Sequence, residues 1–126
     1  MNVKIDTKEK FTVITPEEPA ISANMSEELS QLLLSYLQKD IPHIVVNLQK
    51  VNTIADSMCE LISSLQQQFY TQDCSFVICN LPLAAEKILT DKDLLDTMNI
   101  TPSESEAWDI VQMEEVEREL MRGEWD

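Results

Sequence analysis

Short apolar runs alternate with longer amphipathic segments along most of this chain, and no other feature constrains its fold as strongly. Runs rich in Val, Ile and Phe occur at NVKI, FTVITP, HIVVNL and SFVIC, and this composition is typical of β-strands. Between them, apolar residues recur at three- and four-residue steps, as they do on one face of an α-helix. Strands that alternate with helices predict a sheet with helices packed on it, parallel in its later strands.

The predicted elements follow the order β-β-α-β-α-β-α-β-α. The first two runs are separated by the polar DTKEK, which predicts an N-terminal hairpin. Apolar spacing predicts helices over about residues 25–38 and through residues 58–69, and a continuous apolar run over 44–48 predicts a buried strand. The fold class is therefore α/β, with a mixed sheet of about five strands, namely an N-terminal hairpin plus parallel strands, and about four helices.

The last third of the chain contains two further predicted helices. Pro82 is placed to open a short one, and a short strand is expected near residues 98–100. The final helix should run to about Leu120. Thr101 and Glu104 stand in capping-box spacing at its start, with Pro102 at the first helical position.

Length and charge set the domain count and the classes of partner. The 126 residues suit one domain, which we predict over 1–120, followed by a C-terminal tail, 121–126. The net charge of -14, from 23 acidic and nine basic residues, weighs against nucleic acid and anionic membranes, both of which need clustered Lys or Arg. Half of this excess lies in residues 101–126. A solvated helix face is our first interpretation, and a docking surface for a basic partner is the second.

Several kinds of site lack the residues they need. Gly123 is the only glycine, which excludes glycine-rich phosphate loops, and we expect no cofactor. Cys59, Cys74 and Cys79 have no framework spacing and predict reduced, mostly buried thiols; with the lone His43 they are too few for a metal site. No apolar run reaches the roughly 20 residues that span a bilayer. The N-terminal MNVKIDTKEK has no signal core, so the expected location is the cytoplasm.

The two tryptophans are expected to play different roles. Trp108 lies on the last predicted helix and should pack against the domain. Trp125 lies in the tail RGEWD, where an exposed tryptophan could anchor a partner or a second copy.

The pair Asp56-Ser57 stands where the strand-like HIVVNL leads into the second amphipathic segment, and it has two interpretations. In the first, Ser57 and Glu60 form a capping box and Asp56 adds a negative charge beside the positive end of the helix. In the second, the same helix end is a site of recognition. Helix N-termini favour anions, and a phosphorylated serine there adds a charge of about -1.5 to -2 that makes or breaks an interface.

The layout HIVVNLQKVNTIADSM resembles the STAS domain of bacterial anti-sigma factor antagonists, and the similarity extends over about residues 11–120. In that family a strand leads through the motif Asp-Ser-Ser-Gly into a helix, and the first serine is phosphorylated by a partner that is both serine kinase and anti-sigma factor. Aligned without gaps, this chain has Ala55-Asp56-Ser57-Met58, so Asp56 occupies the phosphorylated position. With a loop one residue longer, Ser57 becomes the acceptor. We favour the ungapped alignment, because VNTIADS gives no independent sign of an insertion.

The resemblance implies a non-catalytic protein that binds other proteins. The implied partner is a GHKL-type serine kinase acting as an anti-sigma factor, the implied phosphorylation site is degenerate, and the chain is expected as a monomer or weak dimer. The alternative within the family is a STAS subunit of a transporter or signalling complex that is never phosphorylated. The expected contact surface is the loop and the exposed face of the next helix, comprising Thr53, Ile54, Ala55, Asp56, Ser57, Met58, Glu60, Ser63, Ser64 and Gln67.

Two functions from other classes are weighed against this one. Acyl carrier proteins are small and very acidic and carry phosphopantetheine on a serine after aspartate at a helix start, which would make Ser57 the attachment site. They are helical bundles, whereas FTVIT, HIVVNL and SFVIC are strand-like runs rich in Val, Ile and Phe. A hydrolase needs a nucleophile beside a base. The lone His43 precedes the strand, at the end opposite Ser57. About five strand residues, each rising about 3.3 Å, would separate the two side chains beyond hydrogen-bond reach, so we predict no catalysis.

Overall fold

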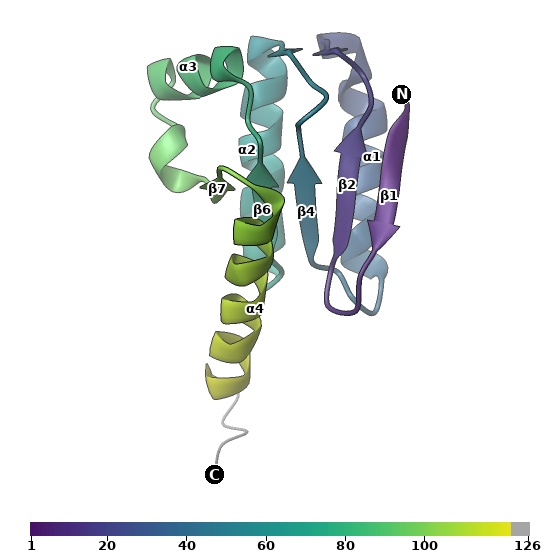
Figure 1. The fold of residues 1–126 in the computed structure, drawn as a ribbon, viewed down its shortest axis with the longest axis vertical. Coiled ribbons are helices and arrows are strands. Elements are labelled where there is room, and N and C mark those ends of the chain that lie inside the picture. The colour runs from purple at the N-terminus through teal and green to yellow at the C-terminus, as the bar shows by residue number, and fades with distance from the viewer. Residues whose placement is uncertain (122–126) are drawn as a thin grey trace.

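The computed structural model describes residues 1–121, which form one five-stranded sheet with helices on both faces (Figure 1). The sheet order is β1-β2-β4-β6-β7, with β1 antiparallel to β2 and all later pairs parallel. This confirms the predicted mixed sheet and its N-terminal hairpin. The elements in chain order are β1 (Val3–Thr7), β2 (Thr12–Pro16), β3 (Ala20–Ile21), η1 (Ala23–Met25), α1 (Ser26–Ser35), η2 (Tyr36–Gln38), β4 (Ile44–Asn47), β5 (Thr53–Ile54), α2 (Asp56–Thr71), β6 (Phe76–Cys79), α3 (Leu83–Asp91), η3 (Leu95–Thr97), β7 (Ile100–Thr101) and α4 (Glu104–Met121).

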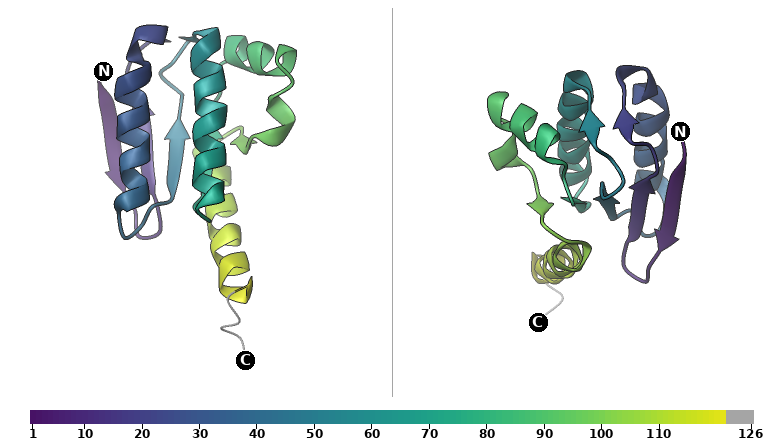
Figure 2. Two further views of the ribbon diagram at one scale, coloured as in Figure 1. Left: turned by 180° about the vertical axis from the view of Figure 1, so that it is seen from behind. Right: turned by 45° about the horizontal axis from the view of Figure 1, so that its top comes forward.

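Both faces of the sheet are covered, and this explains why its central strands are apolar without alternation. Figure 2 shows α1 and α2 on one face, with α3 beside them, and α4 on the other. Ile44, Val46 and Ile78 point into the core beneath α1, α2 and α3, whereas Val45 and Val77 point toward α4. Successive strand residues therefore enter different cores, as the two-residue period of a strand requires.

The side of the sheet under α4 also contains Trp108. Its ring packs edge-to-face on that of Phe11, with the centroids 5.3 Å apart, and the Lys8 ammonium lies 5.0 Å from its centroid. This confirms the prediction that Trp108 packs against the domain. Trp125 and all of the predicted tail except Met121, which ends α4, lie outside the described residues.

A second, two-stranded sheet joins β3 to β5 in parallel, with Ala20 opposite Thr53 and Ile21 opposite Ile54. The sequence did not predict it, because two-residue strands carry no readable periodicity. The carbonyl of Pro19 accepts hydrogen bonds from the amides of Asn52 and Thr53. The small sheet therefore holds the loop before α2 in one place.

The starts of α2 and α4 correct two predicted capping boxes. The N-cap of α2 is Ala55, whose side chain makes no capping hydrogen bond, and Ser57 lies inside the first turn. The Glu60 carboxylate forms an ion pair with Lys92 at 3.1 Å. A Ser57–Glu60 capping box is therefore wrong: the helix starts one residue before Ser57 and leaves its hydroxyl outside the capping position.

The predicted Thr101–Glu104 box is wrong for a different reason. Thr101 belongs to β7, and its hydroxyl donates to the Ser103 carbonyl. The Glu104 carboxylate accepts a hydrogen bond from Asn47. Ser103 stands at the helix start instead, since its carbonyl accepts the first helical bond, from Ala107, and its hydroxyl donates to Glu106 three residues on. Pro102 precedes the helix and is not its first residue.

Candidate functional site

Asp56 and Ser57 lie exposed at the start of α2, near the carboxyl edge of the sheet, where the loops after β4 and β6 also lie (Figure 1). The chain enters this turn through Ala55, whose amide donates to the Ile21 carbonyl at 2.9 Å. The turn is then anchored from inside by Met58, whose side chain is fully buried. A buried residue on either side of the exposed pair, Ile54 and Met58, gives Asp56 and Ser57 a fixed position.

The predicted contact residues separate into exposed and buried groups. Ala55 is half-buried, and Ile54, Met58 and Ser63 are buried. These three cannot be reached by a partner in this structure, so their placement on the contact surface is wrong. The exposed residues are Thr53, Asp56, Ser57, Glu60, Ser64 and Gln67, which we call the α2 rim.

Ser63 is buried although it is polar, because α2 contacts the segment after α3 as well as the sheet. It shares a flank of the helix with Cys59 and Gln66, four residues before and three after it. The Gln66 side chain donates to the Thr97 carbonyl at 2.9 Å and accepts from the Asn99 amide at 2.9 Å. The segment after α3 therefore covers this flank, and a polar residue on it is not exposed.

The electrostatics of the first turn of α2 favour negative charge. The first amides of a helix have no acceptor within it and point outward with the positive end of the helix dipole. Asp56 places a carboxylate there. The pKa of the Cys59 thiol is raised, mainly by burial and next by the negative charge of Asp56. A phosphate on Ser57 would find the same outward amides, together with the neighbouring carboxylate.

Two asparagines that the sequence reading missed organise the carboxyl edge of the sheet. Asn47 ends β4, and Asn80 follows β6 with a positive φ of 56°. The Asn47 Oδ1 accepts hydrogen bonds from Asn80 Nδ2 and from the Gln49 amide, each at 3.0 Å. Asn47 Nδ2 donates to Glu104 Oε1 at 3.1 Å. The signal that could have found them is the shared ending of HIVVN and FVICN, each an apolar run closed by asparagine.

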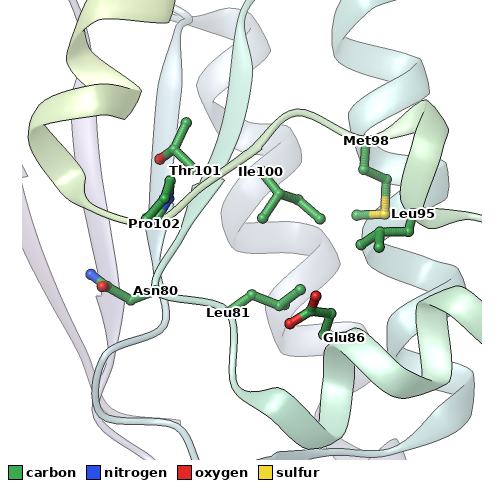
Figure 3. A pocket seen from close by; sticks show the side chains of 8 residues that line it. All are labelled: Asn80, Leu81, Glu86, Leu95, Met98, Ile100, Thr101 and Pro102. Atoms are coloured by element: carbon green, nitrogen blue, oxygen red, sulfur yellow. The ribbon is translucent and has the colours of Figure 1, made fainter.

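A hollow of about 430 Å³ opens at the same edge, between the ends of β6 and β7 and the helix α3. Figure 3 shows Leu81 and Ile100 on one side of it and Leu95 and Met98 on the other, with Glu86 at its margin. Apolar walls beside one carboxylate suit an apolar or basic side chain better than an anion. Its remaining lining residues are Asn80, Thr101 and Pro102.

His43 precedes β4 at the amino end of that strand, whereas Ser57 lies near the carboxyl edge of the sheet. Its Nδ1 accepts from the Ser75 amide at 3.0 Å, and its Nε2 lies 3.4 Å from the Glu115 carboxylate. Burial, followed by the Arg118 guanidinium, lowers the pKa of His43. The structure therefore does not bring this base to Ser57.

The described residues offer few other groups for chemistry at a site. The three cysteines are free and buried, as predicted, and burial raises the pKa of Cys79 to about 12. Residues 1–121 contain no cluster of three or more His, Cys, Asp or Glu arranged to hold a metal ion. Over the same residues, no helix combines the length and apolar character needed to cross a bilayer.

Comparison with solved structures finds the same fold in several proteins. A candidate anti-sigma factor antagonist from Thermotoga maritima is 15% identical and matches with a TM-score of 0.79 over 87% of this chain and 94% of its own. The Bacillus anti-sigma factor antagonist SpoIIAA, in its unphosphorylated form, is 15% identical with a TM-score of 0.70, over 88% of this chain and 96% of its own. SpoIIAA is also known in a phosphorylated form.

A third match belongs to a much larger protein. The murine anion transporter Slc26a9, a solute carrier 26 family member, is 13% identical, with a TM-score of 0.68 over 82% of this chain and 18% of its own. At these identities each match concerns the fold. A comparison by sequence with curated proteins finds no significant match.

The fold also decides between the sequence-based alternatives. A five-stranded sheet with helices on both faces is not a helical bundle, so the acyl carrier alternative for Ser57 is wrong. The family model described as STAS domain matches residues 2–107, most of the chain. The chain belongs to the STAS domain family.

Proposed function

We propose that this protein is a non-catalytic regulatory STAS domain that acts in the cytoplasm like an anti-sigma factor antagonist and binds a serine-kinase-type anti-sigma factor through the α2 rim. The observation that carries the proposal is the exposure of Asp56 and Ser57 on a helix start whose neighbours Ile54 and Met58 are buried. A partner would meet a preformed surface, and binding would cost little ordering of the chain.

The remainder of the α2 rim fits a protein interface. Ser57, Glu60, Ser64 and Gln67 follow one another at steps of three and four residues, so they form one stripe along the helix. Glu60 carries the only charge of this stripe and pairs with Lys92. Serine side chains lose little rotamer entropy on contact, so a partner helix or loop could pack closely against this stripe.

The mechanism that we propose is competition. The α2 rim would occupy the anti-sigma factor and so release a sigma factor from it. Asp56 would supply one fixed negative charge where an ungapped alignment has the phosphorylatable serine, compared with the charge of about -1.5 to -2 of a phosphoserine. The exposed Ser57 would be the acceptor if the loop is one residue longer than the family pattern.

Affinity capture from native extract tests the binding. The full chain should retain a GHKL-type serine kinase, and Ser64→Arg should lose it, because an arginine in the middle of the stripe blocks close packing. Gln38→Arg is the matched control, since Gln38 is exposed on η2, away from the rim. Retention of the same kinase by Ser64→Arg would remove the α2 rim from the interface.

Phosphorylation is tested separately with the captured kinase, ATP and intact-mass analysis. In the ungapped alignment the wild-type chain gains no phosphate and Asp56→Ser gains one. Phosphate on Ser57 of the wild-type chain would show instead that the longer-loop alignment is correct. Loss of that label in Ser57→Ala would confirm the position.

A second candidate function is that of a STAS subunit of a transporter or signalling complex without phosphorylation. The likeness in fold to part of an anion transporter favours it. The same capture experiment separates the two, because a transporter component would take the place of the kinase.

A further inference from the structure

Helix α4 carries apolar side chains on two opposite faces. The inner face packs on the sheet through Ala107 and Val111, which are buried. On the outer face, Met113 is 60% exposed, Val116 is 49% exposed and Leu120 is 52% exposed. A surface helix ordinarily turns one apolar stripe to its own core and a polar face to water, so the second stripe is unexplained by folding.

The outer residues have the spacing of a helix–helix contact. Met113, Val116 and Leu120, which we call the outer seam, are separated by steps of three and four residues, as a and d positions of a heptad are. A shallow hollow of about 610 Å³ lies along the seam, lined by Asp109, Gln112, Met113, Val116 and Glu117. The seam can therefore receive side chains from a second helix.

The charges beside the outer seam have one sign. Glu106, Asp109 and Glu117 are exposed on this side of α4. Arg118, the one basic residue of α4, faces the opposite way: its side chain is buried and bonds with Ser75 and Glu115. The seam is thus an apolar stripe bordered by carboxylates, with the cation of its own helix turned inward.

Arg118 is part of a polar cluster that fixes α4 in this orientation. Glu114 accepts hydrogen bonds from the Tyr70 hydroxyl at 2.8 Å and from the Ser75 hydroxyl at 2.6 Å. Arg118 also lies 3.6 Å from the Asp73 carboxylate. Rotating α4 to bury the outer seam would break these contacts, so the seam must be covered, if at all, by another molecule.

We infer that the outer seam docks a short basic amphipathic helix of a partner protein, with Leu- or Met-like side chains on the seam and Lys or Arg facing Glu106, Asp109 and Glu117. A second copy of this chain fits poorly, since pairing two such helices sets carboxylates against carboxylates. An anionic membrane is repelled by the same charges. The surface is distinct from the α2 rim: α4 runs away from that edge of the sheet and past the other one (Figure 1). The inference goes beyond the proposed function and does not depend on it.

The test uses the full chain, labelled with ¹⁵N, and a synthetic peptide of about three heptads with Leu at a and d and Lys at e and g. A matched peptide carries Glu at e and g. We expect the basic peptide to shift the amide resonances of residues 109–120, and the acidic peptide to bind at least about tenfold more weakly.

Two double variants separate apolar from charge recognition. Val116→Gln with Leu120→Gln removes two of the three apolar side chains of the seam and keeps the charge, and it should weaken binding at least about tenfold. Glu106→Gln with Glu117→Gln keeps the seam, and it should weaken binding by about threefold or more and reduce its salt dependence. Ile5→Gln is the control, because Ile5 is an exposed apolar residue on β1, away from the seam. All these side chains are exposed, and circular dichroism checks that each variant folds.

Three results would overturn the inference. Unchanged affinity in the seam variant would mean that charge alone attracts the peptide. Resonance shifts confined to the α2 rim would place the peptide elsewhere. A wild-type dimer in sedimentation that dissociates in the seam variant would make a second copy the occupant. These three readouts concern the outer seam alone. They can therefore be interpreted even if the capture experiment shows that no kinase binds the α2 rim.

Discussion

Asn80 donates a hydrogen bond through its Nδ2 to Oδ1 of Asn47 over 3.0 Å, and so joins the carboxyl ends of the neighbouring strands β6 and β4. The same Oδ1 accepts the Gln49 amide, and the Asn47 Nδ2 reaches Glu104 at the start of α4. One buried side chain thereby connects two strands, a loop and a helix. These bonds lie at the edge of the sheet that presents the α2 rim.

Replacing Asn47 with alanine should lower the free energy of unfolding by about 1–3 kcal/mol. The change leaves the Asn80 amide and the Gln49 amide without the acceptor they share, and unsatisfied groups near a buried position are costly. Urea unfolding measures the loss. Gln49→Ala is the control, because the Gln49 side chain is exposed and its bond to Asn47 comes from the backbone. Equal losses in both variants would contradict the role assigned to Asn47.

Met58→Ala should destabilise the domain by about 2–5 kcal/mol, because it opens a cavity under the first turn of α2. Met58 is fully buried, whereas Met113 on α4 is exposed. Met113→Ala should therefore change stability by only about 0.5 kcal/mol or less. Thermal and urea unfolding of the two variants compare the same substitution in the two environments. A Met58 variant as stable as the wild type would show that this side chain does not anchor the turn.

His43 should make stability depend on pH. Its pKa is lowered from 6.5 in the folded chain, mainly by burial and then by Arg118, so the unfolded chain binds the proton more readily. Its contribution to stability is complete above about pH 6.5 and is lost as the pH falls through the lower folded pKa. Protonation also removes the lone pair with which Nδ1 accepts the Ser75 amide.

The measurement is the free energy of unfolding by urea of the wild type and of His43→Gln, at several pH values between about 7.5 and 5. The carboxylates titrate in both chains, so the difference between the two reports on His43. That difference should shrink as the pH falls. A difference that stays constant or grows would contradict a lowered pKa.

Ser57→Ala should change stability by about 0.5 kcal/mol or less. Ser57 is exposed and lies after the N-cap, so its removal takes away no capping bond. Asp56→Ala should cost about 0.3–1 kcal/mol through the lost interaction with the helix dipole, and the loss should diminish in high salt. Urea unfolding at low and high ionic strength measures both. A loss of about 1–2 kcal/mol for Ser57→Ala would restore the capping interpretation.

The arrangement of strands and helices was predictable because it depends on local periodicity. The runs at 44–48 and 75–79 are apolar apart from Asn47 and Ser75, and they became β4 and β6. The segment 25–38 became the last residue of η1, followed by α1 and η2. The pairing of β3 with β5 was not predictable, because two-residue segments far apart in the chain form it and no local pattern links them.

The exposure of the predicted contact residues could be foreseen for some of them and not for others. The exposure of Asp56 and Ser57 followed from the polar pair before an apolar helical face. Met58 belongs to that apolar face, and its inclusion in the contact surface ignored the helical period. Ser63 is polar and nevertheless buried, on the flank of α2 where Gln66 bonds to the segment after α3, and no local pattern reports such a neighbour.

Local sequence specifies the alternation of elements, the apolar character of both faces of the sheet and the excess of acidic residues in α4. These properties reside in neighbouring residues, whose backbone preferences and side-chain periods act at short range. The tertiary structure alone decided that Asn47 meets Asn80, that Tyr70 meets Glu114, and that Met113, Val116 and Leu120 face outward. Hydrogen bonds between distant residues, and the face that a helix leaves uncovered, depend on how the packed elements lie against one another, which no local pattern specifies.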